Sequence, residues 1–176
     1  IKSVIYKNNN SLGLNKKNTI INLLFFVYIS FLFSITLLPE TIVIELSESA
    51  IMDFAESPRM LINLTPFASI YDTIKNSINL NTGLFIPLSN ILGNIIIFIP
   101  MGIYVSFKKD MKFSLLAGLL LSISIEICQY LFVKSGLLNM RAVDIDDVIL
   151  NFLGCYLGCL IFNKFKNIKK IKKQMI

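Results

Sequence analysis

Four separate segments of this chain are apolar over about 20 residues each, and they limit the fold more than any other feature. They lie at about 19–38, 84–107, 113–133 and 144–163. A helix needs roughly 20 mostly apolar residues to cross the hydrocarbon core of a bilayer. The sequence is 55% hydrophobic and only 16% charged, which is less charge than a soluble domain usually carries. The sequence therefore predicts an all-α membrane protein, a bundle of four transmembrane helices forming one domain over residues 1–176.

The basic residues predict how these helices are oriented. Most of the 17 lysines and arginines lie at 2–17, 108–112 and 164–173, next to the ends of apolar segments. Such residues accumulate on the cytoplasmic side of a membrane, whereas segment 39–83 is rich in acidic residues. We therefore expect both termini and the lysine-rich tail (164–176) to be cytoplasmic and 39–83 to lie outside. Because topology accounts for the net charge of +6, nucleic acid is not an expected partner.

One further helix is expected between the first two spans. Its apolar residues recur at the spacing of a single helix face; they are Phe67, Ile70, Tyr71, Ile74 and Ile78. Thr65 is a suitable N-cap and Pro66 a suitable first helical residue. We predict an amphipathic helix on the outer membrane surface or across the mouth of the bundle. A short helix that simply packs on its neighbours is the alternative.

Polar residues interrupt three of the apolar segments at similar depths. With a rise of about 1.5 Å per residue, Glu126 and Asn151 each lie roughly 10 Å from the outer end of their segment, and Asn94 up to about 15 Å. Residues three or four apart share a helix face, and polar groups at membrane depth usually face the bundle interior and serve function. We predict one interior polar cluster that binds a ligand, formed by Asn90, Asn94, Ser122, Glu126, Gln129, Arg141, Asp144, Asp147 and Asn151.

Several roles are open for the charged members of this cluster. Glu126 could bind a cationic or hydroxylic group, accept Arg141, or only form hydrogen bonds between helices. Arg141 could instead anchor a phosphate head group. Asp144 and Asp147 could hold Mg²⁺ on a substrate phosphate, or stabilise the helix N-terminus through its dipole. For the two aspartates we favour the stabilisation of the helix N-terminus, and we expect no metal or cofactor. Asp146 is expected to point away from the inward face of the helix.

Small residues in the fourth segment predict close helix packing. Gly154 and Gly158 are four residues apart, so they share one helix face and let another helix backbone approach. Cys128, Cys155 and Cys159 all lie within apolar segments. We expect them to be packing residues rather than disulfide partners or metal ligands.

The absence of histidine narrows the possible enzyme classes. The chain has no histidine, which excludes His-dependent lipid phosphatases, His-based zinc peptidases and Ser–His membrane hydrolases. It has no glycine-rich phosphate loop either. An Asp/Glu-dependent enzyme acting on lipid-linked cell-envelope intermediates remains an alternative. So does a transporter, for which four helices would need to oligomerise.

Four sequence blocks, in this order and spacing, resemble the VanZ-like family. They are NLTPF (63–67), NILGNIIIFIPMG (90–102), SISIEICQ (122–129) and RAVDIDDVILNFLGCYLG (141–158). The F-x-P-x-G pattern of the family is matched by Phe98, Pro100 and Gly102. Its pattern of an acidic residue followed three positions later by glutamine is matched by Glu126 and Gln129. Its R-x-x-D-x-x-D-x-x-x-N pattern is matched by Arg141, Asp144, Asp147 and Asn151.

This resemblance implies a small multi-pass protein of the bacterial cell membrane. A family member is linked to reduced susceptibility to teicoplanin, a glycopeptide that carries a lipid tail, and no settled reaction comes with the family. We therefore expect a non-enzymatic protein that binds or shields a lipid-linked ligand in the outer leaflet. Its partners would be membrane lipids or a lipid-linked envelope molecule, and a homo-oligomer is possible.

Overall fold

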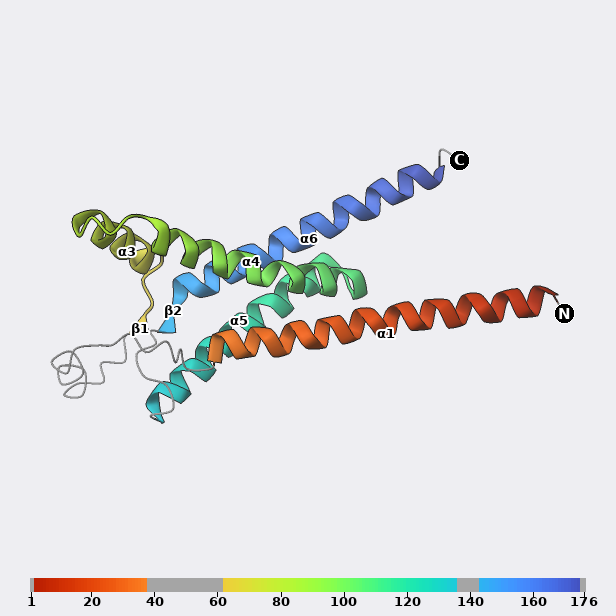
Figure 1. The fold of residues 1–176 in the computed structure, drawn as a ribbon, viewed down its shortest axis with the longest axis horizontal. Coiled ribbons are helices and arrows are strands. Elements are labelled where there is room, and N and C mark those ends of the chain that lie inside the picture. The colour runs from red at the N-terminus through yellow and green to blue at the C-terminus, as the bar shows by residue number, and fades with distance from the viewer. Residues whose placement is uncertain (1, 38–61, 136–142, 175–176) are drawn as a thin grey trace. The chain divides into compact units, whose positions relative to one another are not determined.

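The computed structural model describes residues 2–37, 62–135 and 143–174, and these are almost entirely helical (Figure 1). The helices are α1 (Lys2–Leu37), α3 (Ala68–Asn79), α4 (Phe85–Lys108), α5 (Met111–Lys134) and α6 (Ile145–Gln174). Two short strands, β1 (Ile62–Asn63) and β2 (Val143–Asp144), complete the described elements. The predicted all-α fold class is confirmed.

Four of these helices are long and apolar enough to cross a membrane. The candidate spans are Lys16–Leu37, Phe85–Lys108, Met111–Phe132 and Ile145–Ile168. They agree with the predicted segments to within a few residues, except that the last helix continues through the lysine-rich tail as far as Gln174. The spans also expose large apolar side chains, as helices in contact with lipid do. The chain is thus a membrane protein with several apolar helices.

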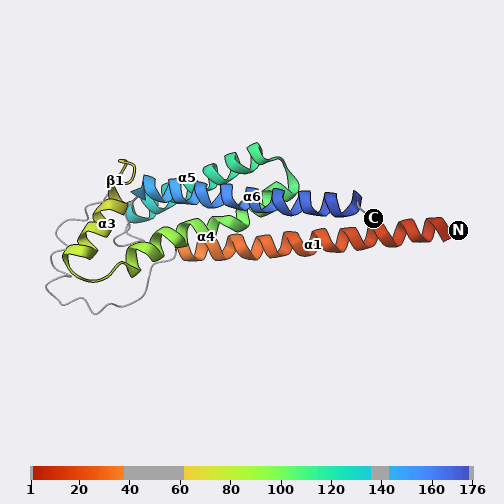
Figure 2. The same ribbon diagram turned by 90° about the horizontal axis from the view of Figure 1, so that it is seen from above.

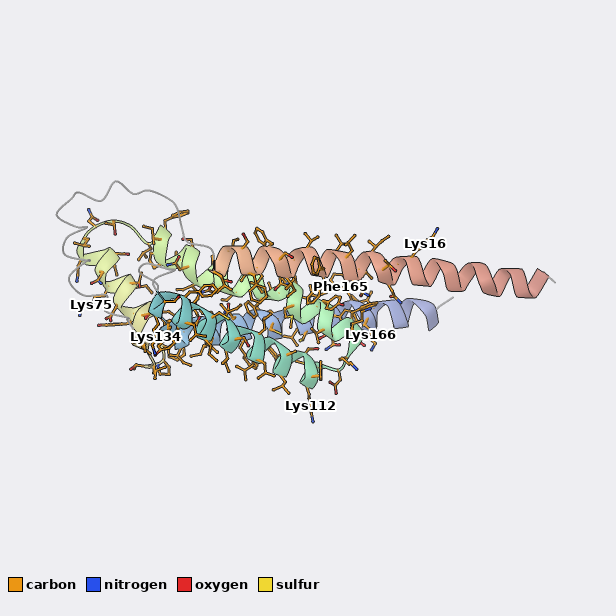
Figure 3. All side chains as sticks on the ribbon, turned by 90° about the horizontal axis from the view of Figure 1, so that it is seen from below. Lys16, Lys75, Lys112, Lys134, Phe165 and Lys166 are labelled. Atoms are coloured by element: carbon orange, nitrogen blue, oxygen red, sulfur yellow. The ribbon has the colours of Figure 1, made fainter. Side chains whose placement is uncertain are left out.

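The chain divides into two compact units. The first, Ile1–Ile35, consists of α1 up to that residue, and the second, Thr36–Ile176, contains all the other described elements. Within the second unit, Lys112 lies near the turn between α4 and α5, and Lys166 lies towards the same end of the bundle (Figure 3). Lys75 and Lys134 lie towards the opposite end (Figure 3). The second unit contains the candidate site.

Helix α6 packs against both α4 and α5 (Figure 2), and glycines bring α6 into backbone contact with α4. A Cβ atom added to Gly154 would lie 2.0 Å from the carbonyl oxygen of Ile95, and one added to Gly158 would lie 2.2 Å from that of Ile99. No side chain fits at such distances, so both positions require glycine. The predicted close-packing role of these glycines is confirmed.

Near Gly118, the contact between α5 and α6 is made through a side chain instead. Cys155 of α6 lies against Gly118 of α5, where an added Cβ atom would be 2.5 Å from the sulfur. The same sulfur is 3.4 Å from the carbonyl oxygen of Ser114 and donates a hydrogen bond to it. Cys155 is therefore a packing residue, as expected from its place in an apolar segment.

The two strands join distant parts of the chain. They pair in parallel, with Ile62 opposite Val143 and Asn63 opposite Asp144. A reading based on helical periodicity does not predict this pairing, because two residues are too few to show the alternation of a strand. The pairing places the segment before α3 beside the start of α6.

Helix α3 is present where an amphipathic helix was predicted, but it begins differently. Its N-cap residue is Phe67, with φ 65° and ψ 4° in the left-handed region, and no side chain of its own provides a cap. The predicted N-cap role of Thr65 is therefore wrong; its carbonyl oxygen accepts a turn hydrogen bond from the amide of Ala68 at 3.2 Å. Tyr71 and Ile78 are 62% and 63% exposed. The location of α3 on the outer membrane surface stays a prediction.

Candidate functional site

The start of α6 is held by a buried group of polar side chains. Oδ1 of Asp144 accepts a hydrogen bond from the amide of Asp146 at 2.9 Å, so Asp144 caps the helix, as its position predicts. The amide of Asp144 itself donates to Oε2 of Glu126 on α5 at 3.0 Å. Glu126 is only 6% exposed. The carboxylate of Glu126, in the third apolar segment, thus accepts a hydrogen bond from the first backbone amide of the fourth segment.

One turn further along α6, the same face contacts α4. Nδ2 of Asn94 donates a hydrogen bond to Oδ1 of Asp147. Asp147 follows Asp144 by three residues, so the two carboxyl groups lie on one helix face. The polar face of α4 therefore meets the polar face of α6.

The next turn of α6 contacts α5 again. Nδ2 of Asn151 donates to Oγ of Ser122 at 2.9 Å. Asn151 is 5% exposed and Ser122 is fully buried. The antiparallel course of α5 and α6 explains the pairing, because moving inwards along α6 corresponds to moving backwards along α5 from Glu126 to Ser122.

These three contacts form a continuous row, which we call the polar ladder. Along α6, its steps are about 4.5 and 6 Å apart at 1.5 Å per residue. The polar ladder consists of Asn94, Ser122, Glu126, Asp144, Asp147 and Asn151. The structure thus brings together most of the residues that were predicted to share one cluster. Ligand binding by the cluster stays a prediction.

The remaining predicted cluster residues lie elsewhere. Gln129 is buried, and its Nε2 donates to the carbonyl oxygen of Thr36 at 2.9 Å, one turn beyond Glu126. Asn90 is exposed on α4. Since Asn94 is level with Asp147, Asn90 lies at a level where α6 has not yet begun, which explains why it does not join the ladder. Arg141 lies outside the described residues.

Asp146 has a structural role that the sequence did not indicate. It does lie off the face of Asp144 and Asp147, as expected, but it is only 2% exposed. Its Oδ1 accepts a hydrogen bond from the amide of Phe67, and its Oδ2 accepts one from the amide of Ile70 at 3.2 Å. Asp146 therefore supplies the N-terminal cap that α3 lacks in its own sequence. No local signal marks this role, because it depends on two segments meeting in space.

Asn63 is a second residue that was not predicted to belong to the site. Its Nδ2 donates to Oδ1 of Asp144 at 2.9 Å and to Oγ of Ser69 at 2.8 Å. Its Oδ1 accepts from the amide of Thr65 at 3.0 Å. The only signal for it was its place in the block NLTPF, which contributed to the family resemblance. Asn63 ties the segment before α3 to the outermost step of the polar ladder.

Apolar helices of spanning length, joined by polar side chains that pair across three of them, define a multi-spanning membrane protein with a polar interior cluster. The chain belongs to the VanZ/LLP1 family, whose sequence model matches residues 25–167. That match covers the last part of α1, from residue 25, and all the elements of the site. No curated protein and no solved structure gives a significant match to the chain.

Proposed function

We propose that this protein binds or shields a lipid-linked ligand of the bacterial cell envelope, and that it thereby lowers susceptibility to lipid-tailed glycopeptides such as teicoplanin. The polar ladder carries this proposal. Polar and acidic groups at membrane depth are costly and usually mark functional sites. Here they occupy facing positions on α4, α5 and α6 rather than a single helix.

The charge distribution supports a site that opens towards the outer leaflet. The polar ladder lies at the end of the bundle where α6 begins and α5 ends. Lys112 and Lys166 lie towards the other end (Figure 3), which by the positive-inside rule would be cytoplasmic. In this orientation both termini are cytoplasmic, and a lipid-linked ligand reaches the ladder from the outer side of the cell membrane.

The hydrogen bonds of the acidic residues favour binding over catalysis. Oδ1 of Asp144 accepts from both Asn63 and the amide of Asp146. Both carboxylate oxygens of Asp146 accept from backbone amides at the start of α3, those of Phe67 and Ile70. Carboxylates engaged in this way hold helix ends in place. This supports a scaffold for a bound ligand more than a set of groups that transfer protons.

A deletion experiment tests the proposal. We expect loss of the gene to increase killing by teicoplanin more than killing by a glycopeptide without a lipid tail, while the membrane lipid profile stays unchanged. The wild-type protein should restore resistance. A Glu126→Leu variant should fail to do so at equal membrane abundance, because the acidic acceptor of the ladder is lost.

The matched control for that variant is Asp110→Leu. Asp110 is also the acceptor of a backbone amide, that of Phe113 at 2.9 Å, but it is exposed and lies far from the ladder. We expect it to restore resistance in full. A new or missing lipid species after deletion, with unchanged susceptibility to teicoplanin, would contradict the proposal and point to an enzyme.

A further inference from the structure

One buried oxygen atom of the polar ladder has no hydrogen-bond partner among the described residues. Oδ1 of Asn151 is the only buried side-chain nitrogen or oxygen atom without a hydrogen-bond partner in the part of the chain that the structure describes. Asn151 as a whole is 5% exposed. An amide oxygen buried in this way loses its bonds to water and gains none in return. Folded proteins rarely leave such an atom unpaired unless a water molecule, an ion or a ligand completes it.

The orientation of this amide is fixed by its other end. Nδ2 of Asn151 donates to Oγ of Ser122 at 2.9 Å, and Ser122 is fully buried. The amide group is planar, so holding the nitrogen also directs the oxygen. The direction of Oδ1 is thus set by the hydrogen bond between the Asn151 nitrogen and Ser122.

The surroundings of Asn151 are rich in acceptors. Asp147 lies one turn before it on α6, and Glu126 lies one turn beyond Ser122 on α5. The side-chain nitrogen of Asn94 already donates to Asp147. A group that enters beside Oδ1 therefore comes within about one helix turn of two carboxylates, which favour hydrogen-bond donors and positive charge. A phosphate, which only accepts hydrogen bonds when ionised, is poorly suited to this position.

We propose that Oδ1 of Asn151 accepts a hydrogen bond from the head group of a bound membrane lipid, and that the ladder therefore selects head groups that carry an N–H or O–H donor. The donor is a primary ammonium or a hydroxyl group. This inference rests on the proposed function, since it assumes that a lipid-linked ligand reaches the ladder. It goes beyond that function by naming the chemistry that is recognised.

Such a site is expected to discriminate strongly between similar head groups. A buried polar atom that pairs with a ligand donor is left unpaired when the donor is missing, so a ligand that differs only by that donor is rejected. Phosphatidylethanolamine and phosphatidylcholine have the same net charge, but only the first has N–H donors. Phosphatidylglycerol offers hydroxyl donors without a cation. These three lipids therefore separate the possible sources of the donor.

The test uses the full-length protein purified in detergent and exposed to these three lipids with identical acyl chains. Retention of each lipid is measured by native mass spectrometry. We expect the wild-type protein to retain at least one donor lipid about tenfold more strongly than phosphatidylcholine, which corresponds to about 1.4 kcal/mol. Preference for phosphatidylethanolamine identifies an ammonium donor, and preference for phosphatidylglycerol identifies a hydroxyl donor.

Variants connect this preference to the orphan oxygen. Asn151→Leu should lower the preference to within about twofold, whereas Asn151→Asp should keep it because an acceptor oxygen remains. The matched control is Asn163→Leu on the same helix; the Asn163 amide lies 3.8 Å from the Met111 sulfur, away from the ladder, and the preference should persist. If Asn151→Leu does not fold, Ser122→Ala provides a milder test. It removes the hydrogen bond that orients the Asn151 amide, so the lipid preference should fall. Its control is Ser124→Ala, an exposed serine of α5.

Equal retention of all three lipids by the wild-type protein would overturn this inference, and water would then be the partner of Oδ1. A preference for donor lipids that persists in Asn151→Leu would also overturn the inference. Either result leaves the proposed function standing if deletion still changes susceptibility to teicoplanin. Conversely, an unchanged susceptibility combined with a clear donor preference would remove the resistance role and keep the lipid site.

Discussion

The carboxylate of Asp146 accepts a hydrogen bond from the backbone amide of Phe67, a residue 79 positions earlier in the chain. Phe67 has a φ angle of 65°, a conformation that is unfavourable for a bulky residue. The carboxylate also accepts from the amide of Ile70, so one side chain of α6 completes the first turn of α3. One acidic residue next to the polar ladder therefore ties the start of α3 to α6.

Replacing Asp146 should release the start of α3. We expect Asp146→Ala to lower the free energy of unfolding by about 1–3 kcal/mol, because buried backbone donors lose their acceptors. Asp146→Asn should have a smaller effect, since one acceptor oxygen remains. Thermal unfolding in detergent measures the stability, and hydrogen exchange of the amides at 67–70 measures the local release.

Asp110→Ala is the control for that experiment. The Asp110 carboxylate accepts a hydrogen bond from the amide of Phe113 at the exposed start of α5. The substitution therefore removes a helix cap of the same kind at another place in the fold. Exchange at 67–70 should stay slow in this variant. Unchanged protection of those amides in Asp146→Ala would show that α3 is held by other contacts.

The glycines of α6 provide a second prediction. Gly154→Ala places a methyl group 2.0 Å from a backbone oxygen of α4, and backbone cannot move aside as a flexible side chain can. We expect a loss of about 1–3 kcal/mol, typical of overpacking, measured by thermal unfolding. Gly93→Ala on α4 is the matched control, because an added Cβ atom there meets nothing within 4 Å. Equal stability of the two variants would contradict the backbone contact.

Asp144 allows a direct comparison of hydrogen bonding with negative charge. Two donors among the described residues, Asn63 and the amide of Asp146, bind the same oxygen, Oδ1. Asp144→Asn keeps such an oxygen and should retain most activity in complementation of the deletion, whereas Asp144→Ala should be weaker because the cap is lost. Asp147→Asn should behave like Asp144→Asn, since its oxygen can still accept from Asn94.

The opposite pattern would indicate metal-dependent chemistry. Mg²⁺ held by these two carboxylates would need their negative charge. Complete loss of complementation with both asparagine variants, together with Mg²⁺-dependent turnover of a lipid phosphate, would rule out the binding role that we propose.

Orientation in the membrane can be tested with single cysteines in a variant that lacks the three native ones. We expect an impermeant thiol reagent to label Ser135→Cys, at the end of α5, in intact cells. Lys112→Cys, at the start of α5, should be labelled only after permeabilisation. The reverse labelling pattern would place the polar ladder at the cytoplasmic side.

The sequence could predict the features that are determined by the residues of a single segment. The four spans followed from apolar length, and the contact of Gly154 and Gly158 followed from their spacing. The polar faces of α4, α5 and α6 followed from periodicity, although only the structure shows that Ser122 pairs with Asn151 and Glu126 with the amide of Asp144.

The features that sequence could not predict depend on two segments meeting. Asp146 was expected only to point away from the inward face of its helix, and its role became visible only with α3 placed beside it. Thr65 had the right residue type for a local cap, but a carboxylate from α6 replaced it and shifted the start of α3. The pairing of β1 with β2 is too short to leave a pattern in the sequence.

The glycine contact also decides which parts of the bundle can move. A slide of α6 along α4 by one helix turn, about 5.4 Å, would bring one glycine opposite the other's carbonyl group but would drive a bulky side chain, Leu150 or Phe162, into the carbonyl group of Ile95 or Ile99. We therefore expect α4 and α6 to travel as one rigid body, with Asn94 and Asp147 remaining partners in every state. The contact of α5 with α6 passes through side chains, such as the sulfur of Cys155 against Gly118 and the hydrogen bond between Asn151 and Ser122, and side chains can adjust. If a ligand opens a passage to Asn151, the passage should lie along the seam between α5 and α6.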